Sequence, residues 1–192
     1  MHGRALMVVL LTSCLWAAEN KPSGIRLRKA YPVTDERIML TWGQSKADVE
    51  AAVAIPNAPI MSTFSCVVVQ DVEVCSVPVW APDFGDPDMV FPFTVGFCGG
   101  KFCSYEVTFP ASRFDFIYGA LESALGKPSA RDETPTQNRM GATFDQSVVR
   151  WQSETTLVLL SKRSDKIDTG KLTVLYGPLA ATVKQRKAQA PF

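Results

Sequence analysis

Cysteine is the residue type with the clearest chemistry in this chain of 192 residues. Cys14 lies in an apolar leader, and four cysteines lie in the body of the chain: Cys66, Cys75, Cys98 and Cys103. An even set of cysteines in a chain that leaves the cytoplasm indicates structural disulfides, and four cysteines allow three pairings. We expect the two local pairs, Cys66 with Cys75 and Cys98 with Cys103. Crossed pairs, such as Cys66 with Cys103, stay open as the alternative.

The spacing of the first pair fits a β-hairpin. A two-residue turn at Gln70 and Asp71 would set Cys66 opposite Cys75 at a non-hydrogen-bonded position. The Cα atoms at such a position lie about 4.5 Å apart, which suits a disulfide. Gln-Asp is not a favoured two-residue turn, so the register is an expectation that the structure must test.

The second pair needs a different loop. If Gly99 and Gly100 alone formed the turn, Cys98 would face Lys101. Cys103 would then lie on the diagonal, about 7 to 8 Å away and too far to bond. A four-residue loop over residues 99 to 102 would instead place the two cysteines directly opposite each other, so regular hairpin geometry favours that loop.

The body of the chain has few of the residue types and motifs that catalysis commonly uses. Histidine occurs once, at His2 in the leader, so the commonest general base and metal ligand is missing from the rest. Catalysis by Ser-His-Asp or Cys-His is therefore excluded, whereas Ser-Lys and paired-carboxylate chemistry stay open. The sequence also lacks the glycine-rich loop of nucleotide-binding proteins. We predict that the protein is not an enzyme and has no cofactor.

One acidic cluster could bind a cation that prefers oxygen ligands, or could serve as a catalytic site made of carboxylates. Asp83, Asp86 and Asp88 lie within six residues, but their spacing does not match a calcium-binding EF-hand loop. Flanking Pro82 and Pro87 indicate an exposed connection. We predict a solvated loop without a metal, and a carboxylate-dependent enzyme is the less favoured alternative.

Candidate binding residues lie around the acidic cluster and in a later loop. Trp80 and Phe84, with Phe91 and Phe93 nearby, would form a contact surface if exposed, because aromatic residues are enriched at binding hot spots. Arg139 is suited to recognising a carboxylate. Core packing for the aromatic residues and a turn for Arg139 are the alternatives.

The N-terminus predicts export. Residues 1–18 combine a positive start with an apolar run, which is the pattern of a signal peptide too short to span a bilayer. Leu11-Thr12-Ser13-Cys14 resembles a bacterial lipobox, in which cleavage precedes a lipidated Cys14. Cleavage after Ala17, which would remove Cys14, is the alternative. We expect a periplasmic protein of a Gram-negative envelope, with a lipid anchor under the first interpretation.

The charge balance argues against nucleic acid as a partner. Loss of the leader removes one of the 20 Lys and Arg residues, and the remaining 19 balance the 19 Asp and Glu residues. A neutral chain has no general attraction to polyanions. The one basic cluster, residues 184–187, lies in the C-terminal tail and is interpreted as solvated.

The remaining pattern predicts an α+β fold made of two helix-then-antiparallel-sheet units, with a tandem duplication and chance similarity as alternative explanations. Residues 19–36 read as a linker, 37–110 as the first unit and 111–192 as the second. Each unit contains a serine with an acid three residues later, at Ser45 after a short strand over residues 37–42 and at Ser112, which is typical of a helix start. Proline-bearing loops and β-branched runs follow each helix.

Three resemblances add to this interpretation. The segment Gly43-Gln-Ser-Lys-Ala-Asp-Val-Glu on an exported chain resembles the helix start of BamE-type outer-membrane assembly lipoproteins. Two α-then-β units in tandem resemble the β-lactamase-inhibitory protein architecture. The chain also resembles uncharacterised exported proteobacterial proteins in a pattern of separate positions. These positions are Gly43, Cys66 with Cys75, Leu121 to Pro128, Gln137-Asn138 and Trp151. These resemblances imply a protein-binding or scaffold module, with an inhibitor of a secreted hydrolase as the alternative.

Overall fold

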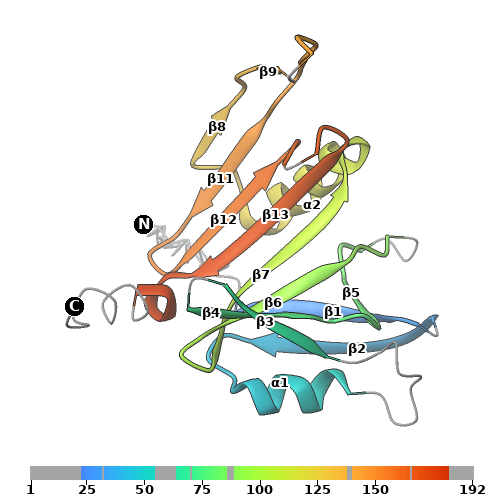
Figure 1. Ribbon diagram of the computed structural model, residues 1–192, viewed down its shortest axis with the longest axis vertical. Coiled ribbons are helices and arrows are strands. Elements are labelled where there is room, and N and C mark those ends of the chain that lie inside the picture. The colour runs from blue at the N-terminus through green and yellow to red at the C-terminus, as the bar shows by residue number, and fades with distance from the viewer. Residues whose placement is uncertain are drawn as a thin grey trace, which may run out of the picture.

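The computed structural model describes residues 23–31, 33–54, 64–69, 71–85, 89–137, 140–164 and 166–181. A large antiparallel sheet of eight strands runs through the molecule (Figure 1). In spatial order its strands are β3 (Ser65–Val69), β4 (Val72–Ser76), β6 (Phe93–Cys98), β7 (Lys101–Pro110), β13 (Thr169–Tyr176), β12 (Thr156–Ser161), β11 (Val148–Gln152) and β8 (Ala130–Asp132).

Smaller elements complete the described chain. A three-stranded sheet has the order β2 (Val33–Thr41), β1 (Gly24–Ala30) and β5 (Trp80–Pro82). A short ribbon joins β9 (Thr136–Gln137) and β10 (Thr143–Phe144). The helices are α1 (Lys46–Val53), α2 (Phe114–Leu125) and a short helical turn over residues 177–181 after β13, and a 3-10 turn, η2 (Ala111–Arg113), precedes α2. No helix among these residues has the length and apolarity needed to cross a membrane.

Alternation of side chains gives the large sheet one buried face. Val95, Tyr105, Val174 and Val158 are neighbours across β6, β7, β13 and β12, and all four are buried. This inner face shares one hydrophobic core with Leu27 and other residues of the small sheet and the two helices. Residues at the intervening positions of these strands point to the opposite, outer face of the large sheet.

Helix α1 is fixed at both of its ends. At its start, Ser45 and Asp48 form a capping box, and the nitrogen of Lys46 donates to the carbonyl of Gly100 at 3.2 Å. At its end, the indole nitrogen of Trp80 donates to the carbonyl of Val53 at 2.9 Å. The predicted helix start at Ser45 is confirmed.

Helix α2 starts differently from the prediction and stops where it was expected to stop. Ser112 lies inside η2, and no side chain caps the first turn of α2. Gly126 ends the helix with a positive φ of 80°, and its carbonyl accepts from the indole nitrogen of Trp151 at 2.8 Å. The serine cap expected at Ser112 is therefore wrong, because a 3-10 turn takes up those residues.

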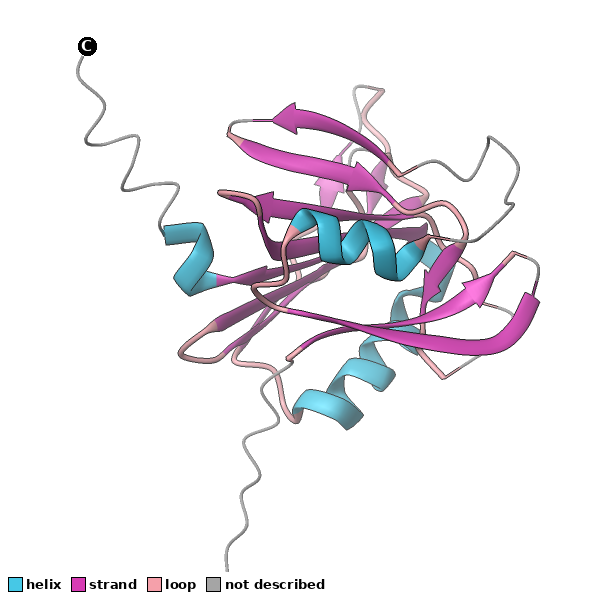
Figure 2. Cartoon of the chain, turned by 90° about the horizontal axis from the view of Figure 1, so that it is seen from below, coloured by secondary structure: helices cyan, strands magenta, loops and turns pink. Residues whose placement is uncertain are grey.

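The predicted α+β fold of two helix-then-sheet units is wrong. Half of the described chain is strand, and strands from both halves form one sheet (Figure 2). Strand β7 precedes the predicted boundary at residue 110 and pairs with β13 from the second half over the whole register from Ser104 to Pro110. Hairpins join neighbouring strands in each half, but this long-range pairing merges the halves.

The predicted linker over residues 19–36 also contains strands. Residues 24–30 form β1 and residues from 33 onward form β2, and the two pair as an antiparallel hairpin. Ile25 and Leu27 are buried at alternate positions of β1, but Arg26, Arg28 and Lys29 give the segment a polar composition. A strand with one exposed face has that composition, so polarity alone did not indicate a linker.

Candidate functional site

The first predicted disulfide staples the edge of the large sheet. Cys66 and Cys75 are bonded, and their Cα atoms lie 4.0 Å apart. In the β3–β4 hairpin Cys66 faces Cys75 and Val69 faces Val72, as the two-residue turn predicts. The pairing and its register are confirmed.

The second predicted disulfide is also formed, although the predicted loop is wrong. Cys98 faces Lys101 across a two-residue turn, yet it is bonded to Cys103 with a Cα separation of 5.7 Å. The register shifts between Gly96 and Phe97, and Cys103 is the extra residue of β7 at this bulge. Because a bulge turns an additional side chain toward one face, Cys103 comes within bonding reach of Cys98.

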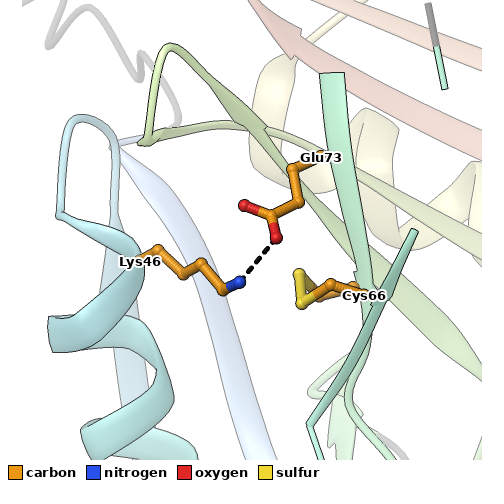
Figure 3. The surroundings of a disulfide bond; sticks show 4 residues. Lys46, Cys66 and Glu73 are labelled. Atoms are coloured by element: carbon orange, nitrogen blue, oxygen red, sulfur yellow. Dashed lines mark hydrogen bonds and ion pairs between the residues drawn. A yellow bond between two sulfur atoms is a disulfide. The ribbon is translucent and has the colours of Figure 1, made fainter. Parts of the chain in front are cut away.

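An ion pair lies beside the first disulfide and joins α1 to the hairpin (Figure 3). The ammonium group of Lys46 lies 2.5 Å from a carboxylate oxygen of Glu73 on β4. Glu73, Cys66 and Cys75 place their potential metal ligands within 4.8 Å of one another. Both sulfur atoms are bonded to each other, however, so neither is a thiolate ligand in this oxidised form.

Among the described strands, β3 forms one edge of the large sheet, and its sequence lacks the usual protection of an edge, so we call it the bare β3 edge. Val67, Val68 and Val69 are consecutive, and 62%, 73% and 52% of their surfaces are exposed. The strand carries no charged residue or proline. Natural sheet edges are normally protected by charges, prolines or short length. The opposite edge, β8, has only three residues and carries Arg131 and Asp132, so it follows that rule.

The pairing pattern shows which main-chain groups of β3 face outward. In a hairpin with a two-residue turn, Val69 and Val72 form the hydrogen-bonded pair next to the turn. Alternation makes Val67 a hydrogen-bonded position and leaves Cys66 and Val68 at non-hydrogen-bonded positions. The N–H and C=O groups of Cys66 and Val68 therefore point away from β4, toward the side of β3 on which no described strand pairs.

The aromatic candidates are placed mainly in the core. Trp80, Phe91 and Phe93 are buried, and Phe84 is half-buried with its ring centroid 6.4 Å from that of Phe91. The exposed aromatic contact surface is therefore not formed, because Trp80 packs beneath α1. Arg139 lies outside the described residues.

The acidic cluster is only partly described. A carboxylate oxygen of Asp83 accepts from Arg37 Nε at 3.1 Å, and its other oxygen accepts from the nitrogen of Gly85 at 3.2 Å. These contacts use Asp83 to hold its own loop. Asp86 and Asp88 lie outside the described residues, as do the signal peptide, Cys14 and the basic tail.

A hollow of about 740 Å³ lies on the outer face of the sheet. Its floor includes Glu106 and Lys171, whose charged groups lie 3.7 Å apart. Glu106 also accepts from Thr173 Oγ1 at 3.2 Å. The carboxylate of Glu106 is thus held by the protein itself, and nothing at this floor selects a particular ligand.

Comparisons with protein-family models, with curated proteins and with solved structures found no match to this chain.

The functional feature that sequence reasoning missed is the bare β3 edge. Its signal was present as the run Val67-Val68-Val69, which is β-branched and uncharged. That run predicts a strand but does not reveal that the strand ends up at an edge.

Proposed function

We propose that this chain is a non-enzymatic, exported protein-binding module, and that strand β3 binds an extended segment of a partner protein. The bare β3 edge carries this proposal. Outward main-chain groups of Cys66 and Val68 can pair with an added strand in the mode called β-augmentation. Neither nucleic acid nor a cofactor forms part of the proposal.

The chemistry of β3 defines the partner segment. Two main-chain positions, two residues apart, require a partner that is extended along the edge. Val67 and Val69 project to the outer face, where β-branched or other apolar side chains of an added strand would pack against them. A charged side chain at those positions would lose hydration without gaining an ion pair, since β3 is uncharged. The segment is therefore apolar at alternate residues.

The edge is held rigid before any partner arrives. The disulfide between Cys66 and Cys75 fixes β3 to β4, and the ion pair between Lys46 and Glu73 fixes β4 to α1. A rigid edge loses little conformational entropy on binding, which favours affinity. The outward main-chain groups of β3 are therefore both unprotected and already held in the geometry that a partner strand needs.

The setting of this function is the bacterial envelope. Residues 1–18 have the pattern of a signal peptide, and disulfides persist in oxidising compartments such as the periplasm. A lipid anchor at Cys14 would hold the module at a membrane surface, which suits a scaffold role. A periplasmic location, with or without the anchor, belongs to this proposal.

Site-specific crosslinking in native cells tests the proposal. A photo-reactive amino acid replaces Val67 in the full chain, and the same group at Arg131 on β8 provides the control edge. We expect an adduct from position 67 that maps to an extended, apolar segment of another protein. Adding Val68→Pro should abolish it, because proline removes the outward N–H without removing a bond of the β3–β4 ladder. Val68→Thr keeps that N–H and should keep the adduct.

Three results would overturn the proposal. One is an adduct no stronger from position 67 than from position 131, and another is an adduct that survives Val68→Pro. The third is an adduct between two copies of this chain, which would make the edge a self-association surface. Intact disulfides in each purified variant show that the hairpin still folds.

A further inference from the structure

A second feature, which shares no residue with the bare β3 edge, is a cavity of about 320 Å³ between α2 and the small sheet. One wall is α2, with Ala120, Leu121, Ala124 and Leu125, and the facing wall includes Ile25 and Phe84. Tyr105 of β7 and Val158 of β12 contribute from the large sheet. Its volume lies at the lower end of the range of about 300 to 1,000 Å³ that is typical of small-molecule sites.

Small residues keep this space open. Ala120 and Ala124 lie one helical turn apart and present only methyl groups to the cavity, whereas Ile117 on the same helix fills the core. Gly24 lines the other wall, and a Cβ atom there would lie 1.7 Å from the carbonyl oxygen of Leu40. Close approach of β1 and β2 therefore requires glycine and leaves that wall without a side chain.

Tyr105 supplies a polar group in this mostly apolar space. Its side chain belongs to the core, with 9% of the residue surface exposed, and its ring stacks on Trp42 at a centroid distance of 5.9 Å. None of the hydrogen bonds within the described part of the chain uses the Tyr105 hydroxyl, and its oxygen is not among the described side-chain atoms that are fully buried without a partner. Burial raises the pKa of Tyr105, so the hydroxyl stays protonated and can donate. A ligand acceptor in the cavity could take a hydrogen bond from this accessible hydroxyl in place of water.

We propose that this cavity binds one compact, neutral, apolar molecule that accepts a hydrogen bond from the Tyr105 hydroxyl. An engineered protein cavity of about 150 Å³ holds benzene, so this space suits a ligand of about two fused rings. The lining has two charged residues, Arg26 and Asp83, and the Asp83 carboxylate is already held by Arg37 and by the nitrogen of Gly85. The remaining lining residues apart from Tyr105 are apolar, which favours a neutral ligand. The site is independent of partner binding at β3.

Calorimetric titration with two matched probes tests this site. The probes are 2-acetylnaphthalene, which has a carbonyl acceptor, and 2-ethylnaphthalene, which has none. We expect the wild-type protein to bind both, and the acetyl compound more tightly. Tyr105→Phe should weaken binding of 2-acetylnaphthalene about three- to tenfold, the usual effect of one neutral hydrogen bond, and leave 2-ethylnaphthalene within about twofold.

Variants that fill the cavity provide the second arm. Ala120→Leu should remove binding of both probes, because the longer side chain occupies the space, and Ala124→Leu is the alternative if the first variant folds poorly. Failure of both probes to bind the wild-type protein would refute the site. Equal losses for both probes in Tyr105→Phe would refute the role of the hydroxyl. Tighter binding of 2-naphthoate, lost in Arg26→Gln, would replace the neutral class with an anionic one, whereas Val68→Pro should leave every titration unchanged.

Discussion

At the scale of single residues, Gly170 fixes how β7 and β13 pack. Gly170 faces Phe109 in the register of these strands, and the Phe109 ring lies over the glycine. A Cβ atom at position 170 would lie 2.3 Å from a ring carbon, which is far inside normal contact. Phe109 is itself buried and packs on Phe91, so its ring has little room to move. The glycine is thus required by its neighbour's side chain.

We expect Gly170→Ala to destabilise the protein by about 1 to 3 kcal/mol, the typical cost of overpacking a core. The measurement is the free energy of unfolding in urea. Gly119→Ala is the matched control, because Gly119 lies in α2 and a Cβ atom there would meet no atom within 4 Å. The control should be neutral or stabilising by up to about 1 kcal/mol, since alanine favours helix. A Gly170→Ala variant as stable as the control would contradict this packing.

Residue identities alone indicated chemistry better than they indicated placement. The cysteine pairs followed from their spacing, because both lie within hairpins. Trp80 was ambiguous, since a tryptophan serves equally in a core and at a binding surface. Its burial depends on α1 lying above it and on β5 pairing with β1, and neither contact is visible in the local sequence.

At the scale of elements, the capping box of α1 links stability to pH. Asp48 accepts from the hydroxyl of Ser45 at 2.6 Å and from its nitrogen at 3.2 Å. The Ser45 side chain is the largest cause, and its main-chain nitrogen the second, of a pKa for Asp48 below the ordinary value of 3.8. A lowered folded-state pKa means that the stabilisation is present above pH 3.8 and is lost as the pH falls through the folded-state value.

We expect Asp48→Asn to lower the free energy of unfolding at neutral pH and to lose that effect in acid. Urea unfolding of both proteins between pH 7 and about pH 2 measures the difference. Ser45→Ala, which removes the hydroxyl donor, should flatten the same pH dependence. A loss in Asp48→Asn that stays constant over the whole range would show that ionisation of Asp48 does not stabilise the cap.

Local geometry explains which hairpin could be predicted. The turn after β3 is regular, so counting outward from residues 70 and 71 gave the observed register from Val69 to Cys66. The turn after β6 is also two residues long, but the bulge at Cys103 interrupts the count. A bulge adds one residue without a sequence signal of its own, and Phe102 and Cys103 are both buried although they are consecutive.

At the scale of the whole molecule, the shared sheet overrides the boundary suggested by the repeated helix starts. Local patterns locate helices and hairpins, but pairing between β7 and β13 joins residues that are far apart in the sequence. Both strands alternate buried residues with half-buried or exposed ones, so either could have formed an edge of its own sheet. Only the long-range pairing between β7 and β13 decides which strands form the edges of the sheet, and it leaves β3 and β8 as the two edges.

A shared sheet also predicts a single cooperative unfolding transition. Leu40 on β2 and Leu172 on β13 belong to the same core, and both have 0% of their surface exposed. We expect Leu40→Ala and Leu172→Ala each to destabilise the full chain by about 2 to 5 kcal/mol and to shift one common transition. Differential scanning calorimetry measures the number of transitions and compares the calorimetric enthalpy with the van't Hoff enthalpy. Two independent units would instead give two transitions, with each substitution shifting only its own, because neither core would depend on the other.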